Sequence, residues 1–91
     1  MKLFMVHVGF YDEEIGEGIY ESHVNFFVAA GNVKSAKKKT FQMEKFKNKK
    51  MHIDGIQEIN VVQDYQIKLE AANGKSETLT YGYDEINKLS N

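Results

Sequence analysis

The sequence predicts an α+β fold, a two-layer sandwich in which one main helix covers one face of a mostly antiparallel sheet of about five strands. Two observations predict this class. Five segments alternate between apolar and polar residues, as half-buried strands do, and one lysine-rich segment has helical spacing. The composition, 42% hydrophobic and 27% charged without cysteine or proline, is typical of a packed globular chain. We therefore expect a single domain over residues 1–91, with the element order β-β-α-β-β-β.

The first two strands are predicted at residues 2–11 and 20–30, joined by a polar loop that contains glycine. A loop this short favours an antiparallel hairpin. One face of this hairpin carries larger apolar residues: Phe4, Val6, Val8, Phe10, Val24, Phe26 and Val28. The other face mixes apolar and polar residues: Leu3, Met5, His7, Gly9, Glu21, His23, Asn25 and Phe27. If the hairpin is centred near Ile15, His7 lies directly opposite His23.

A helix is predicted from Val33 to Lys47, because Asn32 is a good N-cap and Ala36, Thr40 and Met43 form a narrow stripe. The helix could serve as a right-handed crossover that makes the second and third strands parallel. The next segment, 48–54, is interpreted as a connection, and the third strand as residues 56–62.

The last third of the chain predicts a second hairpin. A bend or bulge at Gln63–Asp64 precedes a strand at 65–71, and the return strand runs over 77–83. Asn73–Gly74 is the strongest turn signal in the chain, because both residues accept a positive φ. The apolar pattern of the two strands favours a bulged hairpin. Asp84 is expected to cap a short helical turn that ends near Leu89.

Composition also excludes several classes of function. Without cysteine the chain has no disulfide and no thiolate chemistry, which agrees with a cytoplasmic location. No apolar run approaches the roughly 20 residues that span a bilayer, so we expect no membrane partner. The glycines fit neither a phosphate loop nor a dinucleotide fingerprint and are interpreted as turn glycines. No cofactor is expected.

The three histidines are the first candidates for chemistry. His7, Glu21 and His23 share one face, where two imidazoles and a carboxylate could bind a divalent metal or exchange protons near neutral pH. The alternative interpretation is structural, with these residues hydrogen-bonded in the sheet at a subunit interface. The spacing contains no established metal-ligand motif.

A second candidate is the segment Lys34–Lys50, which holds eight lysines and one acid, Glu44. This charge could steer a nucleic-acid backbone to the helix. The chain has no arginine, however, which argues against nucleic acid as a partner. The lysines could equally form a solvated face, or complement the five acids between Asp12 and Glu21 in another copy.

Two segments resemble a small bacterial family described as domain of unknown function 1543. Residues 18–28 resemble its G…E-x-H-x-x-x-F-V signature, and Met51-His52-Ile53-Asp54-Gly55 resembles its L-H-I-D-x segment. The likeness covers about residues 1–69. It implies no activity, but it marks Glu21, His23, Phe27, His52 and Asp54 as signature positions. Members carry the unit once or twice, so the resemblance also implies pairing of single-copy chains.

Three functional hypotheses follow. The first is a homodimeric interaction or structural module that binds itself or another protein, because one helix leaves half of the sheet uncovered. The second is a small enzyme or ligand- or metal-binding protein that uses Glu21, His23 and His52. In it His23 acts as base or ligand, Glu21 orients it and Asp54 is a second carboxylate. The third is non-specific nucleic-acid binding through the lysine-rich helix.

Overall fold

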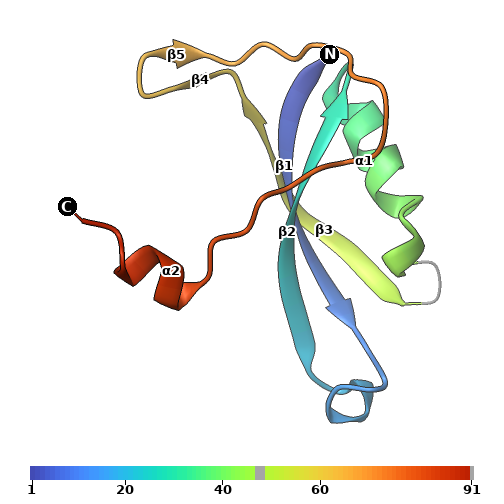
Figure 1. Ribbon diagram of the computed structural model, residues 1–91. Helices are drawn as coiled ribbons and strands as arrows, with labels where there is room; N and C mark the ends of the chain where they lie inside the picture. The colour runs from blue at the N-terminus through green and yellow to red at the C-terminus, as the bar shows by residue number, and fades with distance from the viewer. Residues whose placement is uncertain (47–48, 91) are drawn as a thin grey trace.

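The computed structural model describes residues 1–46 and 49–90. Its centre is an antiparallel three-stranded sheet in the order β2-β1-β3, formed by β1 (Lys2–Tyr11), β2 (Glu21–Ala30) and β3 (Lys50–Ile59). The helix α1 (Val33–Phe41) packs against one face of this sheet (Figure 1). The predicted α+β class, the first hairpin and the single main helix are confirmed.

The strand alternation separates the sheet into two faces. Phe4, Val6 and Val8 of β1 are completely buried beneath α1, which itself buries Ala36 and Thr40. The partners of these strand residues across the sheet, Val28 and Val24 among them, lie on the same side. We call the opposite side of the three-stranded sheet the open face. The helix covers one face and leaves the open face uncovered, as the sequence predicted.

The helix α1 begins as predicted and ends early. Asn32 caps it, since its Oδ1 accepts a hydrogen bond from the Ser35 N–H at 2.8 Å. The predicted helix to Lys47 is wrong, because α1 ends at Phe41 and a 3₁₀ turn follows at Glu44–Phe46. This change of path turns Phe46 inward, which continuous helical spacing after Thr40 would not do. Lys47 and Asn48 lie outside the described residues.

The predicted third strand is wrong in its bounds. Strand β3 starts at Lys50, so His52 and Asp54 belong to the sheet and not to a connection. Strands β2 and β3 run in the same direction, but β1 lies between them, so they do not pair directly. The crossover through α1 therefore spans a central strand.

The five-stranded sheet is also wrong, because the chain turns earlier than predicted. The short strands β4 (Val61–Val62) and β5 (Tyr65–Gln66) form a separate two-stranded hairpin. Its two turn residues, Gln63 and Asp64, have φ values of 47° and 70°, as a tight hairpin turn requires. The predicted bend at these residues is thus a complete hairpin turn. Tyr65 and Gln66 therefore pair with Val61 and Val62, and not with the predicted strand at residues 77–83.

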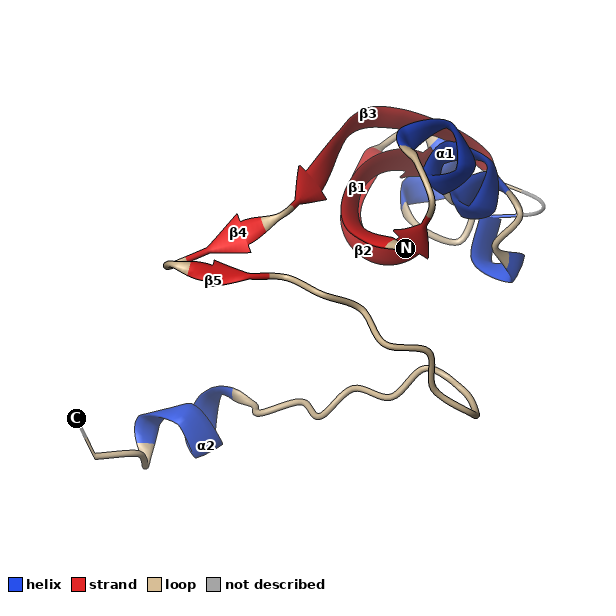
Figure 2. Cartoon of the chain, turned by 90° about the horizontal axis from the view of Figure 1, so that it is seen from above, coloured by secondary structure: helices blue, strands red, loops and turns tan. Residues whose placement is uncertain are grey.

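After this hairpin the chain continues as an extended arm, residues 68–90, which ends in the short helix α2 (Tyr83–Asn87). The predicted strands over 68–71 and 77–83 do not form, and Asn73–Gly74 closes no hairpin. A short terminal helix was expected, but its N-cap is Gly82 and not Asp84. In Figure 2 the arm and α2 stand apart from the sheet and α1.

The dimensions of the chain reflect this arm. Its radius of gyration is 16.0 Å, whereas a compact domain of this length has about 12 Å. Every residue from 68 to 90 is exposed. Among the described residues, no helix has the length and apolar character needed to cross a membrane.

The 3₁₀ turn packs Phe46 against Phe10 and Phe26, and this aromatic cluster gives a test of the core. Phe46 is 5% exposed and its ring lies 5.1 Å from that of Phe26, whereas Phe41 on α1 is 44% exposed. We expect Phe46→Ala to lower the free energy of unfolding by about 3–5 kcal/mol, because it leaves a cavity. The matched Phe41→Ala should cost less than about 1 kcal/mol. Urea unfolding followed by circular dichroism measures both, and equal losses would contradict the assigned core.

Candidate functional site

Five side chains that can bind metals or protons gather on the open face: His7, Glu21, His23, His52 and Asp54. They come from three different strands, with His7 on the central strand β1 and the others on the flanking strands β2 and β3. We call these residues the histidine–carboxylate cluster. The side chains of His23, His52, Glu21 and Asp54 are between one-third and one-half exposed, so the cluster is accessible from solvent.

The two outer histidines point at the same two carboxylates. His23 Nε2 lies 3.3 Å from Glu21 Oε1 and 3.4 Å from Asp54 Oδ2. His52 Nε2 lies 2.6 Å from the same Glu21 oxygen and 3.1 Å from Asp54 Oδ1. Two imidazole nitrogens and two carboxylates therefore converge on one small volume, although β1 separates the strands that carry the histidines. The predicted grouping of Glu21, His23, His52 and Asp54 is thus present in the structure.

Gly9 provides the space for this convergence. It lies on the open face of β1, opposite His23 on one side and His52 on the other. A Cβ atom at Gly9 would lie 2.6 Å from His52 Nε2 and would overlap the Glu21 carboxylate. The predicted place of Gly9 within the first strand, on the face of His7, is confirmed. A lone glycine inside an alternating strand was the available signal, because such a residue often marks a close approach of other groups.

A β-bulge in β3 lies at Asp54, a member of the cluster. In the ladder between β1 and β3, His7 pairs with Gly55 and Val8 with Ile53, so Asp54 is an extra residue without a partner. The bulge lets Ile53 and Ile56 both face the core, although they are three positions apart and would face opposite sides in a regular strand. Asp54, two residues after His52, lies on the open face beside it. The sequence contained this signal as an odd spacing between two apolar residues.

His7 is oriented by a neighbour on β2. Its Nδ1 lies 2.6 Å from Asn25 Oδ1, and since an amide oxygen only accepts, Nδ1 donates this hydrogen bond. The Nε2 atom then keeps its lone pair, which is the tautomer that a metal ligand needs. The His7 ring also stacks on His23, with centroids 5.3 Å apart and planes at 4°. Asn25 is thus a supporting residue that the sequence did not single out.

The register corrects one detail of the prediction. His7 pairs with Asn25, and His23 pairs with Gly9, so the two histidines are offset by two residues and not directly opposite. The loop of the hairpin is longer than expected and contains a 3₁₀ turn at Gly16–Gly18. The offset is what leaves Gly9 between the outer histidines.

The cluster contains two overlapping sets of metal ligands. The ligand atoms of His7, His23 and Asp54 lie within 4.8 Å of one another, and so do those of Glu21, His52 and Asp54. Ligands at 2.0–2.1 Å from a tetrahedral zinc ion are about 3.3 Å apart, close to three of the four nitrogen–oxygen distances above. Asp54 belongs to both sets and turns one oxygen toward each outer histidine. The predicted metal set of His7, Glu21 and His23 is thus divided between them.

The lysines of α1 belong to the helix that covers the side of the sheet opposite the open face, and described lysines of the segment are partly engaged within the chain. Lys39 Nζ donates to the Ala29 carbonyl at 2.6 Å, and Lys45 lies over the Phe26 ring. Lys49 Nζ is 2.8 Å from Asp12 Oδ2, which joins the segment to the acidic loop of the same chain. The lysine-rich segment and the acidic loop are therefore joined by an ion pair within one copy of the chain.

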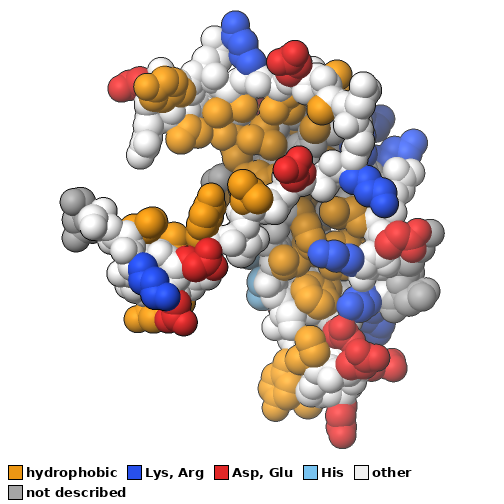
Figure 3. Space-filling view, in the orientation of Figure 1, with side chains coloured by type: hydrophobic (Ala, Val, Ile, Leu, Met, Phe, Trp, Pro, Cys, Tyr) orange, Lys and Arg blue, Asp and Glu red, His pale blue; other side chains and the backbone are white. Residues whose placement is uncertain are grey.

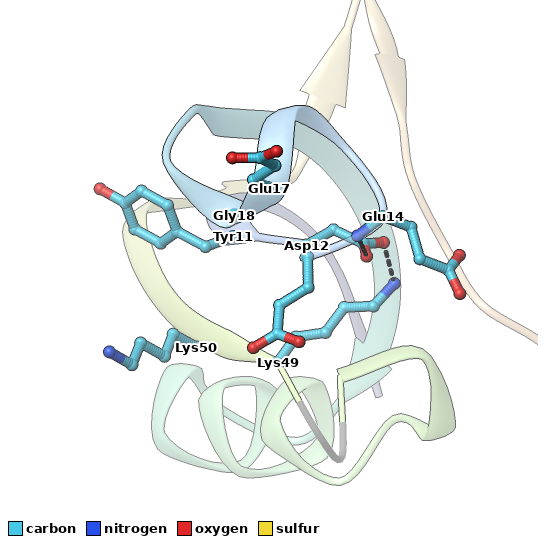
Figure 4. Close-up of a pocket in the computed structure, with 8 residues that line it drawn as sticks. Tyr11, Asp12, Glu14, Glu17, Gly18, Lys49 and Lys50 are labelled. Carbon is cyan, nitrogen blue, oxygen red and sulfur yellow. Dashed lines mark hydrogen bonds and ion pairs between the residues drawn. The ribbon is translucent and has the colours of Figure 1, made fainter.

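A cleft of about 640 Å³ lies between the acidic loop and Lys49–Lys50, lined also by Tyr11 and Gly18 (Figure 4). The Lys49 ammonium and the Glu14 backbone N–H both bind the Asp12 carboxylate and lower the pKa of Asp12. With four carboxylates on one wall and one of its two lysines already paired, the cleft is a poor site for an anion. We assign it a structural role.

No family model matches the chain, and neither curated proteins nor solved structures give a match. The resemblance to domain of unknown function 1543 therefore stays a prediction.

The lowered pKa of Asp12 predicts a pH dependence of stability. The Asp12–Lys49 contact stabilises the fold above the ordinary aspartate pKa, and this contribution is lost as the pH falls through the lowered folded-state pKa. Asp12→Asn should therefore lower the urea midpoint near pH 7 and have a much smaller effect near pH 2. Glu13→Gln, in the same loop, is the control. A difference between wild type and Asp12→Asn that is constant with pH would contradict this role.

Proposed function

We propose that the protein binds a divalent transition-metal ion at the histidine–carboxylate cluster. The observation that carries this proposal is the convergence of His23 and His52, from opposite edges of the sheet, on the Glu21 and Asp54 carboxylates above Gly9. Imidazole and carboxylate together are suited to zinc, iron, manganese or cobalt. A dication also balances the charge of two carboxylates beside neutral imidazoles.

The alternative role for these residues is proton transfer without a metal, with His23 as the base. The mutual arrangement favours the metal. Both outer imidazoles turn Nε2 inward to shared carboxylates, whereas a general base needs its nitrogen directed at a substrate. The open face leaves the solvent side of the cluster accessible, so a bound ion keeps positions for water or a ligand.

Removal of the shared ligand should have the largest effect on metal binding. Asp54→Ala takes a ligand from both sets, so we expect zinc or manganese affinity to fall by at least about 100-fold. Glu70→Ala removes an exposed carboxylate of the arm and is the matched control. Isothermal titration calorimetry of the full chain measures both affinities and the stoichiometry. Affinity should also fall with decreasing pH, because protons compete for the imidazole nitrogens.

A second variant tests the role of Gly9. The added methyl group of Gly9→Ala enters the space that Glu21 and His52 share, so metal affinity should fall although no ligand is removed.

Failure of wild type to bind zinc, manganese or cobalt near pH 7 would overturn the proposal. Unchanged affinity in Asp54→Ala would place the metal elsewhere.

A second proposed function is that of a homodimeric interaction module, and the exposed apolar surface favours it. Phe27 on the open face is 67% exposed, and apolar side chains gather on the face shown in Figure 3 between the β4–β5 hairpin and α2. Surfaces of this kind in small domains commonly mark association sites. The lysine-rich segment leaves nucleic-acid binding as a weaker alternative, since Lys39, Lys45 and Lys49 contact other groups of the same chain.

Sedimentation velocity at tens of micromolar protein tests the homodimer. We expect a species of twice the chain mass, because burial of the exposed apolar surface favours association. Association through apolar surface should persist at high salt, where screened charge contacts weaken. A strict monomer would contradict this proposal and leave the metal proposal intact.

A further inference from the structure

We infer that the C-terminal arm, residues 68–90, packs on the open face of a second copy of this chain. This inference rests on the proposed homodimer and names its surface. The arm contains large apolar side chains without cover: Leu79, Tyr81, Tyr83, Ile86 and Leu89 are between 51% and 83% exposed. Large apolar side chains that are exposed together commonly mark an association site.

The arm has the sequence of a strand with one wet face. Leu79, Tyr81 and Tyr83 alternate with Thr78, Thr80 and Gly82, and the arm is extended up to α2. Such a segment is stable only when its apolar side packs on another surface. It carries tyrosine, which is enriched at protein interfaces. The arm is therefore one half of an interface.

The other half lies on the same chain. The end of the open face away from the histidine–carboxylate cluster is apolar: it carries Leu3, Met5, Phe27, Ala29 and Ile59, with Gln57 as the polar member. This apolar end has no charged side chain to desolvate. The area that α1 leaves uncovered and the apolar arm thus match in chemistry.

Reach and symmetry favour a second copy as the occupant. The β4–β5 hairpin is fixed by its tight turn and by the Ile67 N–H, which donates to the Asn60 carbonyl at 2.8 Å. In Figure 2 the hairpin projects away from the sheet, and the chain after β5 turns back and passes the sheet of its own copy at a distance. The 15 residues from 68 to 82 can span about 50 Å, enough to cross a neighbouring sheet. In a two-fold dimer each copy supplies one arm and one open face, so both are covered in a closed assembly.

The experiment compares two faces of the arm in the full chain. Leu79→Glu/Tyr81→Glu places charges on the apolar side, and Thr78→Glu/Thr80→Glu places the same charges on the polar side as a matched control. Phe27→Glu alters the receiving face. In sedimentation velocity we expect the first variant and Phe27→Glu to be monomers, and the control to remain a dimer. Far-UV circular dichroism should be unchanged in the sheet, since these side chains are exposed in the single chain.

Isotope-filtered NMR on a mixture of labelled and unlabelled copies then identifies the contact. Nuclear Overhauser effects between the Tyr81 ring of one copy and the Met5 methyl of the other are the expected result. The same effects within one copy only would mean that the arm folds back on its own sheet, which overturns the inference.

The outcomes separate the inference from the homodimer. A wild-type monomer overturns both. A dimer that survives Leu79→Glu/Tyr81→Glu, or one that survives Phe27→Glu, overturns the arm docking while the homodimer stands. Equal dissociation of the control variant overturns the assignment of the apolar side of the arm.

Discussion

The alternation of side chains along β1 is the constraint on which both the core and the candidate site depend. Phe4, Val6 and Val8 are buried beneath α1, and the residues between them necessarily face the opposite side. His7 and Gly9 are among those residues, so the packing that holds the helix also fixes the floor of the histidine–carboxylate cluster. Because β1 is central, any shift of its register would expose the core and separate the cluster at the same time.

Part of this arrangement could be predicted from the sequence. Residues 2–11 and 21–30 alternate strongly, and the cap at Asn32 is local chemistry, so the two strands and the start of α1 were identified at nearly their observed positions. Glu21 and His23 were placed on the open face by the same alternation. His52 and Asp54 were singled out as site residues through the resemblance, although the segment that holds them was predicted to be a connection.

The rest depended on interactions that a local pattern does not encode. The β-bulge at Asp54 offsets the alternation within β3, so a search for strict alternation misses the first half of that strand. Asn73–Gly74 is the stronger turn signal in the sequence, but the hairpin forms at Gln63–Asp64. Residues 68–82 are therefore left without a pairing strand. Helix α1 ends at Phe41, and the turn that follows lets Phe46 pack against Phe10 and Phe26. This tertiary packing overrides the helix propensity of the segment.

The open face is apolar at one end and carries the histidine–carboxylate cluster at the other, so metal binding and docking of the arm use the same surface. Its apolar end, around Met5 and Phe27, directly adjoins the His7–Asn25 pair, where the cluster begins. An arm on the apolar end would therefore exclude water from one side of the cluster and leave the other side open. Charges interact more strongly as water is removed, so such a partial cover would strengthen the attraction between a bound cation and the Glu21 and Asp54 carboxylates. Dimerisation and metal binding would then favour one another, since each is linked to the other through the same face.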